Sequence, residues 1–160
     1  MTVFDDHLGL AGRDLTPFRL ILFHGRSGSG KSTAIRFLLE NSFRDRPVEV
    51  VDEIGALRDL FRMRALLRNN VTLLVATHVH PFWFRLLAPG RMLVFHTDRD
   101  PSKIARHLAR LGVSATPAAV QAYVGRFGAT YTDAELIMER WPSPIFDHSL
   151  ARFLKFDRIE

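Results

Sequence analysis

A glycine-rich stretch that follows a short apolar run constrains the fold of this chain more than any other feature. Residues 25–32 read GRSGSGKS and match the pattern G-x-x-x-x-G-K-[ST] without a mismatch. The preceding run, FRLILF at 18–23, has the composition of a buried strand. The following residues, KSTAIRFLLE at 31–40, favour a helix with one apolar side. A strand, a glycine-rich turn and a helix in this order predict a phosphate-binding loop, and with it an α/β fold.

The residue types within this stretch suit a phosphate cradle. Glycines let the backbone curl so that successive N–H groups point at phosphate oxygens, and the helix that begins at Lys31 adds the positive end of its dipole. The Lys31 ammonium can reach the β- and γ-phosphates, and the Ser32 hydroxyl can bind Mg²⁺. The predicted binding residues are Gly25, Arg26, Ser27, Gly28, Ser29, Gly30, Lys31, Ser32 and Thr33.

Strands and helices are expected to alternate in the first part of the chain. Apolar runs predict strands at 48–52, 71–77 and 91–97, and helical periodicity covers 56–69. The segment 81–90 is interpreted as a short helix or a tight connection. This alternation predicts a parallel sheet covered on both faces.

The pattern changes after Asp98, where only helices are expected. One helix covers 101–112, and a second begins after Thr116 and stops at Gly128. A capping box of Thr132 and Glu135 is expected to open a third helix, and Asp147 is a candidate cap for a fourth. We therefore expect a core at 1–98 and a helical lid or cover at 99–160, which can belong to the same compact domain.

Two acidic residues follow the strand at 48–52. A Mg²⁺–nucleotide complex needs a carboxylate at the end of a neighbouring strand, and a water that attacks phosphate needs a group that orients it. Asp52 is the candidate metal ligand and Glu53 the candidate base. The alternative is that both acids only start the next helix, where they favour its dipole.

Polar residues also follow the strand at 71–77. Thr77 and His78 can contact the γ-phosphate or the attacking water, because ligands of open α/β sheets gather at the carboxyl ends of the strands. His80, two residues on, is an alternative to His78. The simplest alternative is a strand that gives way to a polar loop.

The segments GRSGSGKS, VEVVDE and VTLLVATH together resemble the additional-strand, catalytic-glutamate division of P-loop ATPases, over residues 18–97. That division includes the ABC, AAA+ and RecA-like ATPases. The resemblance implies a three-layer α/β/α fold with parallel strands in the order 48–53, 71–77, 18–24, 91–97. It also implies that Lys31, Glu53, Thr77 and His78 serve ATP hydrolysis with Mg²⁺ at Ser32 and Asp52, the Walker A and Walker B residues.

The chain departs from most members of that division in two respects. Only seven residues, 41–47, join the loop helix to the strand at 48–52, and no LSGGQ-like run is present. A compact ATPase core is therefore implied, and not a standard ABC transporter subunit. The helical tail is similar to an AAA+ lid in its pattern of helices.

Two other functions remain open. A P-loop small-molecule kinase would use Asp52 toward an acceptor hydroxyl, and its strand 48–53 would lie beside strand 18–24. A regulatory or DNA-associated module that binds nucleotide without hydrolysing it would not need Glu53. Phosphate release and the effect of Glu53→Gln distinguish these functions.

The composition of the chain limits the cellular compartments and the binding partners that we expect for the protein. The chain has no cysteine and no apolar run long enough to span a membrane, so we expect a cytoplasmic protein. Its net charge of +5 favours polyanions, which leaves nucleic acid open as a partner beside ATP and a protein partner or a second copy. Arginines at 58, 62, 64 and 68 can form an arginine finger, a basic face or a solvated face. Three successive aromatic rings at 82–84 cannot all face one core, so one ring can be exposed and form a docking patch for a partner. Packing of this run under the helical tail is the slightly favoured alternative.

Overall fold

A computed structural model of the chain describes residues 6–52, 54, 57–69 and 71–156. The chain divides into two compact units. A sheet unit comprises Met1–Gly25 and Gly30–Thr97, and a helical unit comprises Arg26–Ser29 and Asp98–Glu160. The four residues 26–29, from the middle of the glycine-rich motif, therefore group with the helical unit.

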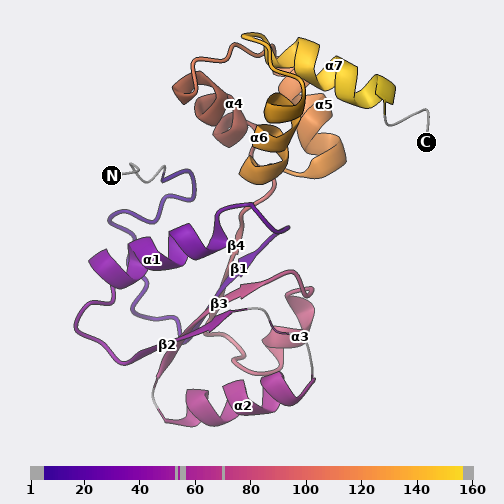
Figure 1. The fold of residues 1–160 in the computed structure, drawn as a ribbon. Helices are drawn as coiled ribbons and strands as arrows, with labels where there is room; N and C mark the ends of the chain where they lie inside the picture. The colour runs from indigo at the N-terminus through magenta and orange to yellow at the C-terminus, as the bar shows by residue number, and fades with distance from the viewer. Residues whose placement is uncertain (1–5, 53, 55–56, 70, 157–160) are drawn as a thin grey trace. The chain divides into compact units, whose positions relative to one another are not determined.

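The sheet unit contains four parallel strands, which Figure 1 shows in the order β2-β3-β1-β4. The strands are β1 (Leu20–His24), β2 (Val48–Asp52), β3 (Thr72–Thr77) and β4 (Met92–His96). All three pairings are parallel, and Leu22 of β1 lies opposite Val75 of β3 and Val94 of β4. This arrangement confirms the expected α/β class and the expected strand order, with β3 between β2 and β1.

Helices cover both faces of the sheet because successive residues of β1 point to opposite sides. On one face, Ile21 and Phe23 pack with Ile35 and Leu38 of α1 (Lys31–Asn41). On the other face, Leu20 and Leu22 pack with residues of α2 (Leu57–Arg68) and α3 (Phe82–Arg85), including Met63 and Phe84. The sheet unit is thus a three-layer α/β/α structure, as Figure 1 shows.

The short helix α3 gives the aromatic run two environments. Phe84 is fully buried beneath the sheet face that α2 also covers, whereas Phe82 and Trp83 are 56% and 50% exposed. The exposed rings of Phe82 and Trp83 agree with the less favoured of the two interpretations of this run, in which at least one ring is exposed.

The helical unit consists of α4 (Pro101–Arg110), α5 (Pro117–Phe127), α6 (Tyr131–Arg140) and α7 (Phe146–Phe156). It has a hydrophobic core of its own, which includes Ile104, Leu108, Tyr123, Ile137 and Phe146. As expected, Thr116 caps α5 by accepting the Ala119 N–H at 3.2 Å, and α5 stops at Gly128, whose φ is 76°. Throughout the described part of the chain, no helix has both the length and the apolar character needed to cross a membrane.

The capping box at Thr132 and Glu135 was a wrong prediction. Helix α6 begins at Tyr131, and its N-cap is the extended Thr130. The hydroxyl of Thr130 donates to the Asp133 carboxylate at 2.6 Å, so the local pairing lies two residues earlier than expected. Glu135 instead lies 2.9 Å from His107 of α4. Helix α6 begins earlier than predicted because the chain turns at Gly128, the C-cap of α5, and Thr130 is already the extended N-cap residue. Helical geometry therefore begins at the next residue, Tyr131.

Asp147 is not an N-cap either, because α7 begins at Phe146 and places Asp147 within the first turn. Its carboxylate accepts hydrogen bonds from the N–H and the hydroxyl of Thr116. Asp147 therefore ties the start of α5 to the start of α7.

Candidate phosphate-binding site

The glycine-rich motif begins where the central strand β1 ends. Gly25 directly follows His24 and is buried, and its N–H donates to the Thr77 carbonyl at the end of β3, at 3.2 Å. At the other end of the motif, Gly30 is the N-cap of α1 and has a left-handed conformation, with φ 88° and ψ 18°. Glycine adopts this conformation at no steric cost, which lets the chain turn sharply into the helix.

The half-buried Lys31 lies at the first position of α1 and reaches back to the start of the motif. Its Nζ donates to the Gly25 carbonyl at 2.8 Å. The ammonium has three donors, so a bond to Gly25 is compatible with further bonds to a bound anion. The position of this cation, next to the N-terminus of a helix, fits the predicted phosphate cradle.

The candidate metal ligands lie on exposed ends of two elements. Ser32 and Thr33 are exposed in the first turn of α1, and Asp52 is the exposed last residue of β2. Asp52 is opposite Ala76, so it lies at the same carboxyl edge of the sheet as Thr77.

A hydroxyl and a carboxylate are ligands that fit Mg²⁺, which takes oxygen ligands and keeps several waters. Among the described residues no group of three or more His, Asp or Glu side chains forms an all-protein metal site. The expected Mg²⁺ site does not need one, because phosphate and water would complete the coordination. Glu53, the candidate base, lies outside the described residues, so its role stays a prediction.

The two candidate sensor residues differ in environment. Thr77 is buried, and its Oγ1 accepts the Val79 N–H at 3.0 Å. A hydroxyl that accepts one bond still has its own proton to donate. His78 is exposed, and so is His80, whose Nδ1 accepts the Phe82 N–H at 3.3 Å. The backbone bond from Gly25 brings Thr77 to the motif, whereas no described contact does so for either histidine.

Two histidines that the sequence analysis did not single out lie at the same edge of the sheet. His24 and His96 end the neighbouring strands β1 and β4, and their ring centroids are 5.3 Å apart. Each is the last residue of its strand, but only the strand order shows that they are neighbours.

Within the helical unit, residues 26–29 are held by main-chain and side-chain hydrogen bonds. The Tyr131 N–H donates to the Gly28 carbonyl at 2.9 Å, and Lys103 Nζ donates to the Ser29 carbonyl at 2.7 Å. The Arg26 N–H donates to Asp98 Oδ2 at 3.1 Å. Sequence reasoning missed these contacts. The available signal was Lys103 itself, a cation in the first turn of a helix, where the dipole disfavours it.

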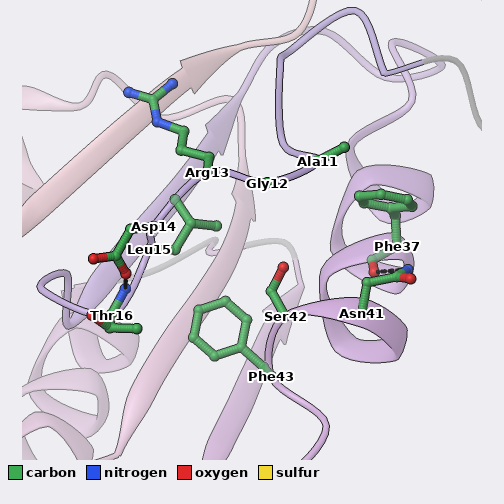
Figure 2. Close-up of a pocket in the computed structure, with 10 residues that line it drawn as sticks. All are labelled: Ala11, Gly12, Arg13, Asp14, Leu15, Thr16, Phe37, Asn41, Ser42 and Phe43. Atoms are coloured by element: carbon green, nitrogen blue, oxygen red, sulfur yellow. Dashed lines mark hydrogen bonds between the residues drawn. The ribbon is translucent and has the colours of Figure 1, made fainter.

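A cavity of about 430 Å³ lies elsewhere in the sheet unit. Figure 2 shows that its lining comes from the segment 11–16 and from the end of α1 with the residues that follow, including Phe37, Asn41 and Phe43. Lys31 and Ser32 lie at the opposite end of α1, and no predicted site residue lines the cavity.

No protein-family model, no curated protein and no solved structure matches this chain. The motif, the strand order and the residues at the carboxyl edge of the sheet are therefore the features of this chain that point to a function.

Proposed function

We propose that this protein binds ATP with Mg²⁺ and hydrolyses it. The observation that carries the proposal is the position of the motif G-x-x-x-x-G-K-S between a central parallel strand and the helix α1. A buried strand before the motif and a helix after it form the context that distinguishes a phosphate-binding loop from a chance match to the pattern.

The neighbouring strands supply the other groups that this reaction needs. Asp52 ends β2 and Thr77 ends β3, at the same edge as the motif. Lys31 and the N-terminus of α1 would bind the phosphates, and Ser32 and Asp52 would hold Mg²⁺, which neutralises charge that develops on the phosphate oxygens.

In the proposed reaction, Glu53 accepts a proton from a water molecule whose oxygen attacks the γ-phosphorus. The bond between the γ-phosphorus and the β–γ bridging oxygen breaks, and ADP leaves with the electron pair of that bond. Lys31 stabilises the charge on the transferred phosphoryl group, and Thr77 or His78 contacts the γ-phosphate or the attacking water. ADP and phosphate are the products, and the difference between ATP and ADP would switch the helical unit or a protein partner between two states.

The strand order argues against the kinase alternative. A kinase of the kind considered above would have β2 beside β1, whereas here β3 lies between them. The alternative of a nucleotide-dependent module without hydrolysis differs from the proposal only in the role of Glu53.

The direct test measures phosphate release from ATP by the purified chain, with and without Mg²⁺ and with and without DNA. Lys31→Ala is expected to abolish ATP binding, because it removes the cation of the cradle. Glu53→Gln is expected to keep ATP bound and stop turnover. Phosphate that appears on a metabolite, with no free phosphate under any condition, would refute the ATPase proposal in favour of a kinase.

Ser32 and Thr33 form a matched pair for the metal. Both are exposed hydroxyl residues in the first turn of α1, but only Ser32 is proposed to bind Mg²⁺ through its side chain. Ser32→Ala should weaken Mg²⁺-dependent ATP binding by roughly tenfold or more, since a contact to a charged group contributes about 1.5–3 kcal/mol. Thr33→Ala removes a hydroxyl from a predicted binding residue that is not a metal ligand, so it should leave the Mg²⁺ dependence of ATP binding unchanged. Equal effects of the two substitutions in a titration of ATP with Mg²⁺ would contradict the assignment of Ser32.

A further inference from the structure

Lys103 lies in the first turn of α4 and is fully buried. Its Nζ donates to the Ser29 carbonyl at 2.7 Å and lies 4.5 Å from the centroid of the Tyr131 ring. Burying an ammonium costs free energy unless its surroundings compensate for the lost water. The carbonyl and the aromatic face provide that compensation, so this lysine is built into a defined position and does not lie on a solvated surface.

A second contact holds the adjacent peptide. The Gly28 carbonyl accepts the Tyr131 N–H at 2.9 Å, and Gly28 has a left-handed φ of 71°. A Cβ at position 28 would collide with Thr132 Oγ1 and lie 2.8 Å from Thr132 Cβ. Residues 28 and 29 are therefore fixed in the helical unit by two donors and by close packing on the start of α6.

These contacts set the direction of a motif N–H group. In a planar trans peptide, the C=O of one residue and the N–H of the next point in opposite directions. The Ser29 carbonyl and the Gly30 N–H belong to one peptide, so the bond from Lys103 to Ser29 fixes the direction of the Gly30 N–H on the opposite side. The Gly28 carbonyl and the Ser29 N–H also belong to one peptide and point in opposite directions. The Gly28 carbonyl accepts the Tyr131 N–H, and the Ser29 N–H donates to the Arg26 carbonyl at 3.3 Å, which closes the turn.

We infer that Lys103 is a positioning residue for phosphate binding: it holds the Ser29 carbonyl so that the Gly30 N–H is oriented toward the bound phosphate. This inference rests on the proposed nucleotide binding. Lys103 acts through the backbone of the loop and does not touch the phosphate, which is the role of Lys31. Nucleotide affinity thus depends on α4, a helix about 70 residues away in the sequence.

The test compares the wild type with Lys103→Met, which keeps the length and removes the donor, and with Lys103→Arg, which restores a donor. Lys155→Met is the matched control, because Lys155 is an exposed lysine near the end of α7. ADP with Mg²⁺ is titrated while the amide signals of the ¹⁵N-labelled chain are recorded. The wild type should show a large shift of the Gly30 amide signal.

Lys103→Met should lower ADP affinity by about tenfold or more, because a charge-assisted hydrogen bond that orders the loop is lost. Its Gly30 shift should shrink, while Lys103→Arg recovers both and Lys155→Met matches the wild type. A folded Lys103→Met with wild-type affinity and a wild-type Gly30 shift would overturn the inference. So would a loss of affinity with an unchanged Gly30 shift, which would indicate direct contact between Lys103 and phosphate.

The amide signals of α5, α6 and α7 report whether the helical unit stays folded. If these amide signals disappear in Lys103→Met, Lys103→Gln is measured instead. The glutamine side chain is one bond shorter than lysine, so its amide does not reach the Ser29 carbonyl. Wild-type affinity with a wild-type Gly30 shift, or a loss of affinity with an unchanged Gly30 shift, would overturn the inference in this variant too. Unfolding of the helical unit in both variants would also overturn the inference, because Lys103 would then be a folding determinant. Failure of the wild type to bind any nucleotide would refute the proposed function and this inference together, whereas wild-type binding with unaffected variants would refute this inference alone.

Discussion

Tyr123 shows how one buried polar group is accommodated in the helical unit. Its hydroxyl donates to the Thr130 carbonyl at 2.7 Å and lies 2.9 Å from Thr130 Oγ1. Its ring packs near Phe127 and Phe146, with centroids 5.3 and 5.5 Å away. Burial raises the pKa of Tyr123 to about 12, with a smaller opposing effect from the hydrogen bond with Thr130. The folded helical unit therefore favours the neutral phenol.

This environment predicts a late ionisation in alkali. One of the chain's two tyrosines should ionise near pH 12 when its near-ultraviolet absorbance is followed, and Tyr123→Phe should remove that step. The raised pKa stabilises the fold fully below the ordinary tyrosine pKa of about 10, and this stabilisation is lost as the pH rises through about 12. Ionisation of both tyrosines near pH 10 in the folded protein would contradict this description of the core.

Between elements, the starts of α5 and α7 are joined by one side-chain cluster. Thr116 caps α5, and Asp147 in the first turn of α7 accepts bonds from the Thr116 N–H and hydroxyl. These hydrogen bonds hold the pKa of Asp147 below its ordinary value. The two helices are thus linked by hydrogen bonds that favour an ionised carboxylate.

Acid should weaken this link. Because the folded pKa of Asp147 is lowered, its stabilisation is present above the unfolded pKa of about 3.9 and is lost as the pH falls through the folded pKa. Asp147→Asn should lower the melting temperature near neutral pH and reduce its decline in acid, as followed by circular dichroism. Asp45→Asn, at an exposed position between α1 and β2, is the control and should behave as the wild type. Equal acid sensitivity of wild type and Asp147→Asn would count against the role of Asp147.

At the scale of the whole molecule, the chain builds separate hydrophobic cores for its two units. Leu74 of β3 is fully buried in the core between the sheet and α1, and Phe146 of α7 is fully buried in the core of the helical unit. A cavity made in one core removes contacts from that unit only. The two units are therefore expected to respond differently to matched substitutions.

Leu74→Ala should cost about 2–5 kcal/mol of stability and raise amide exchange mainly in the sheet unit. Phe146→Ala should cost about 3–5 kcal/mol and raise exchange mainly in α4 to α7. Amide hydrogen exchange read by mass spectrometry measures both effects in one experiment. Uniform loss of protection along the chain in both variants would show that the units unfold together.

The sequence predicted the sheet better than it predicted the motif's surroundings. Apolar runs located all four strands, and the resemblance to a known division of ATPases supplied their order, because motif, acidic pair and polar strand end recur there at set positions. The caps of α5 were readable from Thr116 and Gly128 because capping is local. The contacts of Lys103 and Tyr131 could not be predicted from the sequence. A buried lysine that donates to a backbone oxygen about 70 residues away produces almost no pattern in the residues around it.

The grouping of residues 26–29 with the helical unit has an evolutionary consequence. A recombination event that joined a foreign tail at residue 98 would transfer the helices but leave behind the four motif residues that they hold. The incoming tail would have to supply new donors for two carbonyl oxygens. The tail is therefore expected to be inherited together with the motif.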